Sequence, residues 1–522
     1  MNIAQILSGQ AAERGDAPAL IDGRNGRDRV LSFRGLESAG ARFAEQIARL
    51  GIGEGDAVLI LYPMAAELYA FLIALFRIGA VGMFLDPSAG REHVERCIKI
   101  YPPKAFFGSA KAQLLRLWIP ALRRISPALC TTALPGTVHL RLSAPGAERA
   151  TIAAAAESAP ALITFTSGST GEPKAAMRSH GFLVAQHRAL KASLHHRAGV
   201  VDMTTLPVFV LANLASGITS VIPDADMTKP GRIAAPPVLR QLECLSVATM
   251  AASPAFVSRL TVECRGSGLR VASLKQVFMG GAPVFPEDLR QARDAFPQAE
   301  VTAVYGSTEA EPMAEVSLSA ITSDDFDAMA RGRGLLAGLP VASITLRILR
   351  NQWGTPIPPL DELQFQSLCL GAEEVGEIVV SGEHVLRGYL NGAGDAETKF
   401  RVAGVPWHRT GDLGWMDRAG RLWLMGLAAA AIHDDRGVLY PFAVELAARQ
   451  IPGVRRAAIL AVQGRRVLAL ETDVSGAAGT ARGKFEWAQL DDVRILRSIP
   501  MDKRHNAKVD YAALRRVLSD DK

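Results

Sequence analysis

The chain has 522 residues, 49% of them hydrophobic, which is more than one hydrophobic core usually supports, so we expect at least two domains. A formal net charge of +6 is small for this length. The Lys and Arg residues are scattered along the chain, so we do not expect a nucleic acid as partner.

The first part of the sequence alternates helical patterns with short apolar runs. Residues 34–52 carry apolar side chains at helical spacing, residues 56–62 (DAVLILY) have the pattern of a buried strand, and residues 66–80 predict the next helix. Strands and helices that alternate at this rhythm predict mainly parallel sheets covered by helices.

The best candidate for a membrane span is residues 68–85. Arg77 lies in the middle of this run, and a charge at the centre of a bilayer is costly, so we predict a buried helix followed by a strand and no transmembrane span. The first residues lack the basic start and apolar core of a signal peptide. The five cysteines lie far apart, without metal-ligand spacing, which favours reduced thiols in a cytoplasmic protein.

The pattern changes after about residue 340. Residues 343–349, 376–382 and 421–426 predict short strands separated by glycine turns, which indicates a smaller β-rich subdomain. Residues 491–518 predict a strand, a polar loop and a basic helix. The expected fold class is therefore α/β.

Residues 164–174, TFTSGSTGEPK, follow an apolar strand with small hydroxyls, glycines and a lysine, a composition suited to holding phosphate. A Walker-type loop places four residues between its glycines and Lys-Ser or Lys-Thr directly after the second. Here Gly168 and Gly171 have two residues between them, and Lys174 comes only after Glu172 and Pro173. The spacing therefore argues against a kinase or a GTPase.

Three further motifs accompany this loop: AVYGSTEAEP at 303–312, WHRTGDLGWMDRAGRLWLMG at 407–426, and HNAKVDYAAL at 505–514. In this order and at these separations, the four motifs resemble the adenylate-forming superfamily of acyl-CoA synthetases, peptide-synthetase adenylation domains and luciferases. The resemblance covers essentially the whole chain. It implies a large N-terminal domain at 1–427 and a small, mobile α+β C-terminal domain at 428–522 that carries the catalytic lysine.

The reaction of this superfamily joins a carboxylate to the α-phosphate of ATP and expels pyrophosphate, so the protein must orient a polyanion and neutralise developing charge. The resemblance implies Lys508, Thr308 and Glu309 as catalytic residues, with Glu309 holding Mg²⁺, since a hard divalent cation prefers oxygen ligands. It implies that Tyr305 stacks on adenine and that Asp412 binds both ribose hydroxyls. The full set of implied ATP-binding residues is Thr166, Ser167, Gly168, Ser169, Thr170, Gly171, Lys174, Gly281, Ala282, Pro283, Tyr305, Gly306 and Asp412.

The acyl pocket is expected around residues 206–217, LPVFVLANLASG, the segment that lines this site in relatives. The candidates are apolar apart from one amide, and none offers a charged anchor for an amino group, so an apolar acid is a better substrate than an amino acid. Any one of these residues is as readily explained as plain core. The candidate lining is Val208, Phe209, Val210, Asn213, Met279 and Gly280.

The sequence departs from the family pattern after Gly426. Relatives continue with an arginine that touches ribose and then an Asp or Lys hinge, whereas this chain has Leu427 and four alanines, which places the hinge at Ala430. Two explanations of the alanine run stay open. The sequence diverged naturally, with Arg436 or Arg421 in place of the missing arginine, or the alanines were introduced by engineering.

The acceptor of the acyl group is suggested by residues 433–442, HDDRGVLYPF. Acyl-CoA synthetases have a glycine-rich turn here, so the charged residues weaken the case for CoA. The segments DKRHNAK at 502–508 and GVLY at 437–440 look more like the β-lactone synthetases of bacterial olefin biosynthesis, in which the substrate's own β-hydroxyl displaces AMP. Alternatives are transfer to CoA or a carrier protein, with a pathway enzyme as partner, and a degenerate adenylate-binding protein without catalysis.

Overall fold

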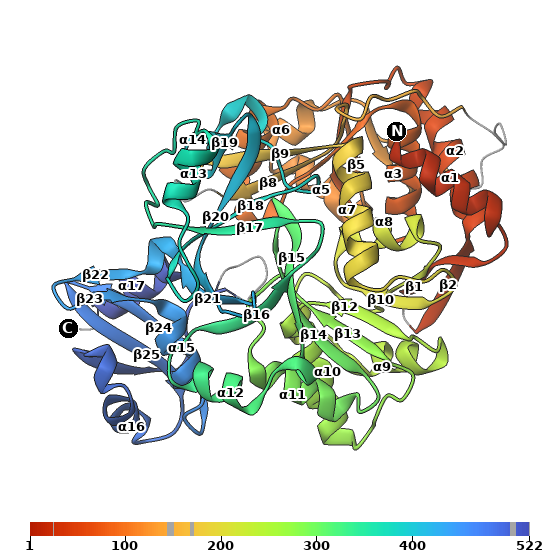
Figure 1. The fold of residues 1–522 in the computed structure, drawn as a ribbon. Coiled ribbons are helices and arrows are strands. Elements are labelled where there is room, and N and C mark those ends of the chain that lie inside the picture. Colours follow the sequence, from red (N-terminus) through yellow and green to blue (C-terminus); the bar gives the residue numbers. More distant parts are fainter. Residues whose placement is uncertain (25, 143–150, 168–171, 502–507, 521–522) are drawn as a thin grey trace.

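The structure is a computed structural model that describes residues 1–24, 26–142, 151–167, 172–501 and 508–520 (Figure 1). Two large sheets, each lined by helices, form most of the molecule, and a small sheet with its own helices follows at the C-terminal end. The fold is therefore α/β, as the sequence predicted.

The first large sheet begins with parallel strands in the order β1 (Pro18–Arg24), β11 (Thr219–Ile222), β10 (Val201–Thr204), β12 (Thr249–Ala252), β13 (Gln276–Met279) and β14 (Glu300–Ser307), with β2 (Arg27–Ser32) antiparallel at the edge. It continues through antiparallel strands β15 (Ala310–Ser317), β16 (Leu335–Pro340), β21 (Leu422–Leu427), β20 (Val405–Met416), β18 (Gly376–Ser381) and β17 (Thr345–Leu349), and β19 (Lys399–Val402) also pairs with β20. This antiparallel half confirms the predicted β-rich region.

The second large sheet is parallel over β7 (Val138–His139), β6 (Ala128–Cys130), β5 (Ala105–Gly108), β3 (Ala57–Leu61), β4 (Val81–Phe84) and β8 (Pro160–Ser167), and ends on antiparallel β9 (Pro173–Ser179). All five residues of β3 are buried, as expected for a strand covered on both faces. Residues 168–171, between β8 and β9 in the chain, lie outside the described residues.

Helices α1 (Ile3–Glu13), α2 (Phe33–Ala48) and α3 (Ala66–Ile78) share one buried apolar cluster. Ser32 caps α2, its side chain accepting a hydrogen bond from the Gly35 N–H. Gly79 ends α3 with φ of 71°, a left-handed conformation that suits glycine. The run at 68–85 is therefore a helix followed by β4, and Arg77 forms a buried ion pair with Glu37. No helix in the described part of the chain is long and apolar enough to cross a membrane.

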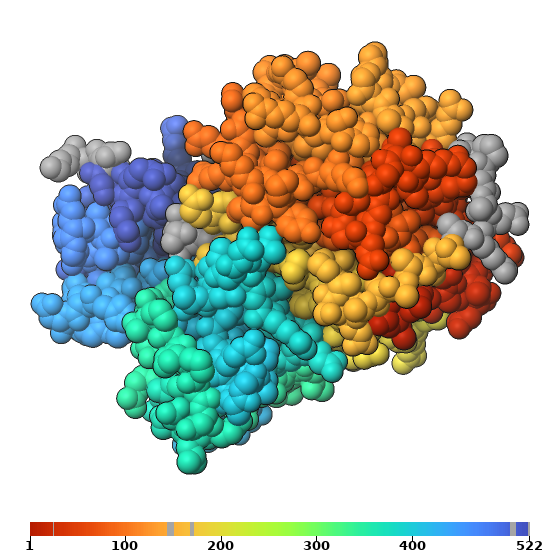
Figure 2. Space-filling view, turned by 90° about the horizontal axis from the view of Figure 1, so that it is seen from above, coloured from red at the N-terminus to blue at the C-terminus, as the bar shows by residue number. Residues whose placement is uncertain are grey.

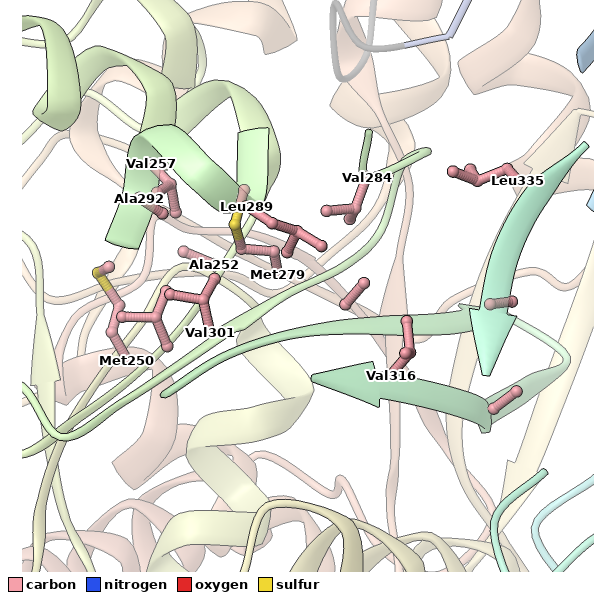
Figure 3. Packing of buried hydrophobic residues seen from close by; sticks show 14 of the residues in the cluster. Met250, Ala252, Val257, Met279, Val284, Leu289, Ala292, Val301, Val316 and Leu335 are labelled. Carbon is pink, nitrogen blue, oxygen red and sulfur yellow. The ribbon is translucent and has the colours of Figure 1, made fainter. Parts of the chain in front are cut away.

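Helices also cover the parallel half of the first sheet, and Figure 3 shows the core between them, where Met250, Met279 and Val301 from the strands meet Val257 and Leu289 from the helices. The helices that follow α3 in the large N-terminal region are α4 (Arg91–Ile100), α5 (Ala110–Leu114), α6 (Pro120–Arg124), α7 (His180–Ser193), α8 (Pro207–Ala215), α9 (Ala235–Cys244), α10 (Pro254–Ser267), α11 (Pro286–Ala295), α12 (Ser323–Ala330), α13 (Glu362–Leu368) and α14 (Asp395–Thr398).

The C-terminal part forms one end of the molecule, beside the β-rich region (blue and cyan in Figure 2). It contains the hairpin β22 (Ile432–Asp434) and β23 (Gly437–Leu439), the sheet β24 (Val454–Val462), β25 (Arg465–Thr472) and β26 (Asp492–Leu496), and helices α15 (Pro441–Arg449), α16 (Ala477–Lys484) and α17 (Tyr511–Asp520).

Helix α15 joins this part to the rest of the molecule through two faces. Ala443 and Leu446 belong to the core of the first sheet, whereas Val444, Ala447 and Ala448 belong to the C-terminal core. The expected boundary at 427/428 falls between β21 and a short 3₁₀ turn, η6 (Ala428–Ala430), so Ala430 lies in the connection. The boundary and rotation about Ala430 stay predictions.

Candidate active site

Tyr305 and Asp412 meet although 107 residues separate them in the chain. Tyr305 lies on β14 and Asp412 on β20, and the Tyr305 hydroxyl donates a hydrogen bond of 2.6 Å to Asp412 Oδ2. Burial raises the pKa of the Asp412 carboxyl, and this hydrogen bond and the positive charge of Lys508 partly oppose the rise. The two residues expected to bind adenosine are therefore neighbours.

Lys508 lies close enough to Asp412 for its charge to act on that carboxyl. Lys508 is exposed and lies before α17, next to Val509, which forms an antiparallel bridge with Met501. Residues 502–507 lie outside the described residues. The C-terminal part thus presents its candidate catalytic lysine to the β-rich part.

Thr308 and Glu309 form the tight turn between β14 and β15, where Ser307 pairs with Ala310. The turn is fixed from three sides: Arg178 donates a 2.9 Å hydrogen bond to the Thr308 carbonyl, the Ser307 hydroxyl accepts a 3.2 Å bond from the Glu309 N–H, and the Leu386 N–H donates a 2.7 Å bond to the Glu309 carbonyl. Gly306 precedes it, and a Cβ there would lie 3.0 Å from Glu311 Cγ and 3.3 Å from the Ala310 carbonyl oxygen, so a side chain would require these neighbours to shift.

The Glu309 carboxylate lies in a polar cluster that we call the Tyr389 cluster, made of Tyr389, Lys399, His408 and Glu309 itself. The Tyr389 hydroxyl donates a 2.7 Å hydrogen bond to Glu309 Oε1. Burial alone would raise the pKa of Glu309, but interactions with His408, with the Tyr389 hydroxyl and with Lys399 bring the pKa below its ordinary value. The carboxylate is therefore held ionised, the form in which it would bind a cation.

Lys399 is the unusual member of the Tyr389 cluster. Its ammonium donates a hydrogen bond to the Leu386 carbonyl and lies 5.5 Å from the centroid of the Tyr389 ring. Burial lowers the pKa of Lys399 to about 8, although Glu309 and Asp395 favour the charged form. Burial likewise lowers the pKa of His408 to about 3, so its imidazole is neutral at physiological pH.

Lys174 approaches the same tyrosine from the phosphate-loop side. Its ammonium lies 5.8 Å from the Tyr389 ring centroid and forms a 2.8 Å ion pair with Glu397, with 9% of the lysine side chain exposed. Thr166 faces Lys174 across the β8–β9 pair. Of the rest of the predicted loop, Ser167 ends β8, and Gly168, Ser169, Thr170 and Gly171 lie outside the described residues.

The turn expected to flank adenine follows β13. Gly281 has φ of 80°, and a Cβ on Gly280 would come within 3.0 Å of the Val304 carbonyl, so both positions suit glycine. Ala282 and Pro283 are half-buried in this turn. The turn lies one strand from Tyr305, since β13 pairs with β14.

The six acyl-pocket candidates do not lie together. Phe209 packs in an apolar cluster between α7, α8 and the sheet, which we call the Phe209 cluster, with Val208 at its margin. Met279 points to the opposite face of the sheet and packs against Leu289 (Figure 3). Successive strand residues face opposite ways, so Phe278 and not Met279 belongs to the same cluster as Phe209. The buried members of the Phe209 cluster are Leu190, Leu194, Phe209, Ala212, Ala251, Phe278 and Val304.

Val210 and Asn213 lie on the other face of α8. Val210 packs in the core shared by α1, α2 and α3. Asn213 is fully buried and donates hydrogen bonds of 2.7 Å to Asp202 and 2.9 Å to Ser220. These contacts give both residues a packing role, and an acyl contact for either stays a prediction.

The two arginines considered as substitutes for the missing ribose arginine are both engaged elsewhere. Arg421 forms ion pairs of 2.8 Å with Asp325 and 2.7 Å with Asp417. Arg436 forms ion pairs of 2.9 Å with Asp434 and Asp491 in the C-terminal part. Leu427, which follows Gly426, lies directly opposite Asp412 on the neighbouring strand and is 44% exposed.

The sequence analysis did not identify Tyr389, Lys399, His408 or Glu397 as parts of the site. His408 lies within the recognised motif at 407–426, four residues before Asp412, so its place in that motif was the available signal. Lys399 and Glu397 belong to residues 394–400, GDAETKF, which have the pattern of a polar surface loop. No local feature of the sequence identifies them as site residues.

Comparison with known proteins agrees with this arrangement. Residues 7–390 match the AMP-binding enzyme family. The chain is 31% identical to the olefin beta-lactone synthetase of Stenotrophomonas maltophilia, over 97% of this chain and 96% of that protein. It is 26% identical to 4-coumarate–CoA ligase 3 of Oryza sativa, over 89% and 80% of the two chains.

Among solved structures, the O-succinylbenzoate Coenzyme A synthetase MenE of Bacillus subtilis in complex with ATP and magnesium ion superposes with a TM-score of 0.78 over 99% of both chains, at 20% identity. The fold, the motif order and the sequence similarity lead to one conclusion: the chain belongs to the AMP-binding enzyme family and is an ATP-dependent, AMP-forming, adenylate-forming ligase.

Proposed function

We propose that this enzyme activates an apolar β-hydroxy carboxylic acid with Mg-ATP and then closes the acyl-adenylate to a β-lactone. The observation that supports the activation site best is the meeting of Tyr305, Asp412 and Lys508 from three distant parts of the chain. The similarity to an olefin beta-lactone synthetase along nearly the whole chain supports the second step.

In the first step, a carboxylate oxygen of the acid attacks the α-phosphorus of ATP, and the bond to the pyrophosphate leaving group breaks. Asp412 accepts hydrogen bonds from the ribose hydroxyls. For this, either the Tyr305 hydroxyl must give up its hydrogen bond to Asp412 Oδ2, or both ribose hydroxyls must donate to the other carboxylate oxygen. Lys508 lies between the acid and the α-phosphate and neutralises the charge that develops there. Thr308 donates to an α-phosphate oxygen.

Magnesium fits the Glu309 site as part of a complex with ATP. The described ranges hold no group of three or more His, Cys, Asp or Glu side chains that could bind a metal ion alone. Mg²⁺ typically binds one or two carboxylates together with substrate phosphates and water, and ionised Glu309 supplies one carboxylate. A bound Mg²⁺ would neutralise phosphate charge. Lys174 would then break its ion pair with Glu397 and bind the phosphates instead.

In the second step, the β-hydroxyl oxygen of the substrate attacks its own acyl carbon. A C–O bond forms, the bond from the acyl carbon to AMP breaks, and the hydroxyl proton is released. The nucleophile is already tethered, so no acceptor channel is needed. At the hairpin β22–β23, where relatives that use CoA have small residues, Asp434 forms ion pairs with Arg436 at 2.9 Å and with Arg466 at 2.6 Å, which supports an acceptor other than CoA.

The substrate class rests on the Phe209 cluster, whose members are all apolar. An apolar acyl chain is the class that such a wall binds without leaving a polar group unpaired.

Product identification tests the proposal. The enzyme is incubated with Mg-ATP and matched fatty and β-hydroxy acids, with and without CoA, and the products are identified by mass spectrometry. We expect AMP and a product one water lighter than the β-hydroxy acid, independent of CoA, with no such product from the fatty acids.

Other products identify the alternatives. A CoA thioester would make the enzyme an acyl-CoA synthetase, in line with its similarity to 4-coumarate–CoA ligase 3. Accumulated acyl-AMP would indicate a missing carrier protein. Binding of ATP without release of AMP would indicate a degenerate adenylate-binding protein.

A further inference from the structure

The C-terminal end of α7 and the turn after it form an open cleft of about 470 Å³ that has no part in the reaction described above. Its walls are Arg188, Lys191, Ala192, His195, His196 and Arg197. The volume falls within the range of small-molecule sites, roughly 300–1,000 Å³.

The charge of this cleft is of one sign. Arg188, Lys191 and Arg197 are exposed, and none of the three forms an ion pair with a described residue. Other arginines of this protein, such as Arg421 and Arg436, form ion pairs with carboxylates. The nearby acid Glu315 accepts a hydrogen bond from Ser193 instead. Three cations around one concavity therefore have no counter-ion among the residues that the structure describes.

His196 makes the cleft more than a patch of surface charge. It is 92% buried in the cleft wall, and its Nδ1 has no hydrogen-bond partner among the residues the structure describes. A buried polar atom without a partner is costly and points to a missing ligand, ion or water. Only a group small enough to enter the cleft can meet this ring, which argues against a flat protein surface as the occupant.

We propose that this cleft binds a phosphate-ester anion. Two guanidinium groups match phosphate oxygens in a bidentate manner, Lys191 adds a point charge, and the combined charge suits a group with two or more negative charges. The cleft adjoins the Phe209 cluster, because Leu190 and Leu194 of that cluster alternate with Lys191 and His195 of the cleft wall. The bound phosphate therefore lies beside the candidate acyl site.

Two probes separate the possible sources of such a phosphate. Fructose 1,6-bisphosphate, titrated by calorimetry, represents a soluble phosphate ester. Phosphatidylglycerol vesicles, compared with phosphatidylcholine vesicles in a sedimentation assay, represent a lipid headgroup. Binding to either probe that depends on the cleft supports the proposal, and the probe that binds identifies the source.

The cleft variant is Arg188→Glu with Lys191→Glu. The matched control is Arg265→Glu with Arg270→Glu, two exposed arginines elsewhere with the same total change in charge. We expect the cleft variant to lose at least about tenfold in affinity for each reversed charge, because hydrogen bonds to charged groups are the strong ones, and the control to stay within about twofold. His196→Leu should weaken binding by about tenfold without a change in net charge.

Acyl-AMP formation at the wild-type rate by each variant shows that it is folded. Binding that survives in the cleft variant would assign the phosphate to the nucleotide site and overturn the proposal. Equal loss in the cleft and control variants, no effect of His196→Leu, or no binding of either probe would also overturn it.

Discussion

Lys399 shows how burial changes the chemistry of a single residue. An exposed lysine is charged up to about pH 10, whereas Lys399 is held beside Tyr389 with a pKa of about 8 because burial disfavours its charged form. Its positive charge in turn helps to keep Glu309 ionised. The charge of the candidate metal ligand thus depends on a lysine that no motif contains.

This coupling predicts a pH dependence. Lys399 loses its proton as pH rises through about 8, so the positive charge beside Glu309 disappears while Glu309 stays ionised. A positive charge beside a metal ligand repels Mg²⁺, so adenylation at limiting Mg²⁺ should rise across roughly pH 7–9. Lys399→Met should remove this limb of the pH–rate profile and lower the Mg²⁺ requirement at pH 7 by about tenfold. Lys399→Arg should keep the charge and move the limb above pH 10, since arginine stays protonated. Pyrophosphate release measured from pH 6 to 10 tests this. A limb near pH 8 that persists in Lys399→Met would assign it to another group; Lys229→Met, at an exposed site, is the control.

Helix α8 shows that one element can serve two purposes on two faces. Phe209 and Ala212 face the Phe209 cluster, whereas Val210 and Asn213 face the core and the sheet. Asp202 accepts bonds from Asn213 and, at 2.6 Å, from Thr249, and burial raises its pKa to about 6. Asn213 thus satisfies a buried carboxyl of the sheet.

Asn213→Ala should therefore lower the free energy of unfolding by about 1–3 kcal/mol, because Asp202 loses a buried hydrogen bond. The preference for acyl chain length should not change. Phe209→Ala is the comparison, and it should change that preference. Denaturant unfolding and rates with a series of acids measure the two effects. A changed chain-length preference in Asn213→Ala, with unchanged stability, would instead place Asn213 in the acyl pocket.

Strands β20 and β21 bring Leu427 opposite Asp412, where side chains of paired strands lie about 5 Å apart. Arginine at 427 should reach the ribose side of the site, so Leu427→Arg should lower the KM for ATP by about two- to tenfold, the range expected for a charged hydrogen bond at a partly exposed position. Leu427→Met should leave it unchanged. An unaltered KM in Leu427→Arg would show that ribose binding does not use this position.

At the scale of the whole molecule, the C-terminal part places Lys508 beside the Tyr305–Asp412 pair. Helix α15 holds this arrangement through its two apolar faces, and Arg449 at its end lies 3.9 Å from the centroid of the Phe285 ring in the N-terminal part. The structure therefore brings Lys508 close to Asp412, and we propose that it acts there in the adenylation step.

Lys508→Ala should reduce the rate of acyl-AMP formation by about 100-fold or more, the usual effect of removing one group that stabilises transition-state charge. Binding of ATP, measured by calorimetry, should change little, since Asp412, Tyr305 and Glu309 remain. The exposed Arg515→Ala on α17 is the control. Retained turnover in Lys508→Ala would remove this lysine from the reaction.

The sequence by itself determined the alternation of strands and helices, the burial of residues 68–85, the β-rich region after residue 340 and the membership of the family, because these follow from local periodicity and from residues close together in the chain. Only the tertiary structure decided which side chains share a site. It assigned Met279 and Phe278 to opposite faces of one strand, gave Asn213 to the sheet, and brought Tyr389 and Lys399 to Glu309. Some of these contacts join residues far apart in the chain, such as Tyr389 and Glu309, which are 80 positions apart, and they depend on strand register and on helix packing, which a local pattern does not contain.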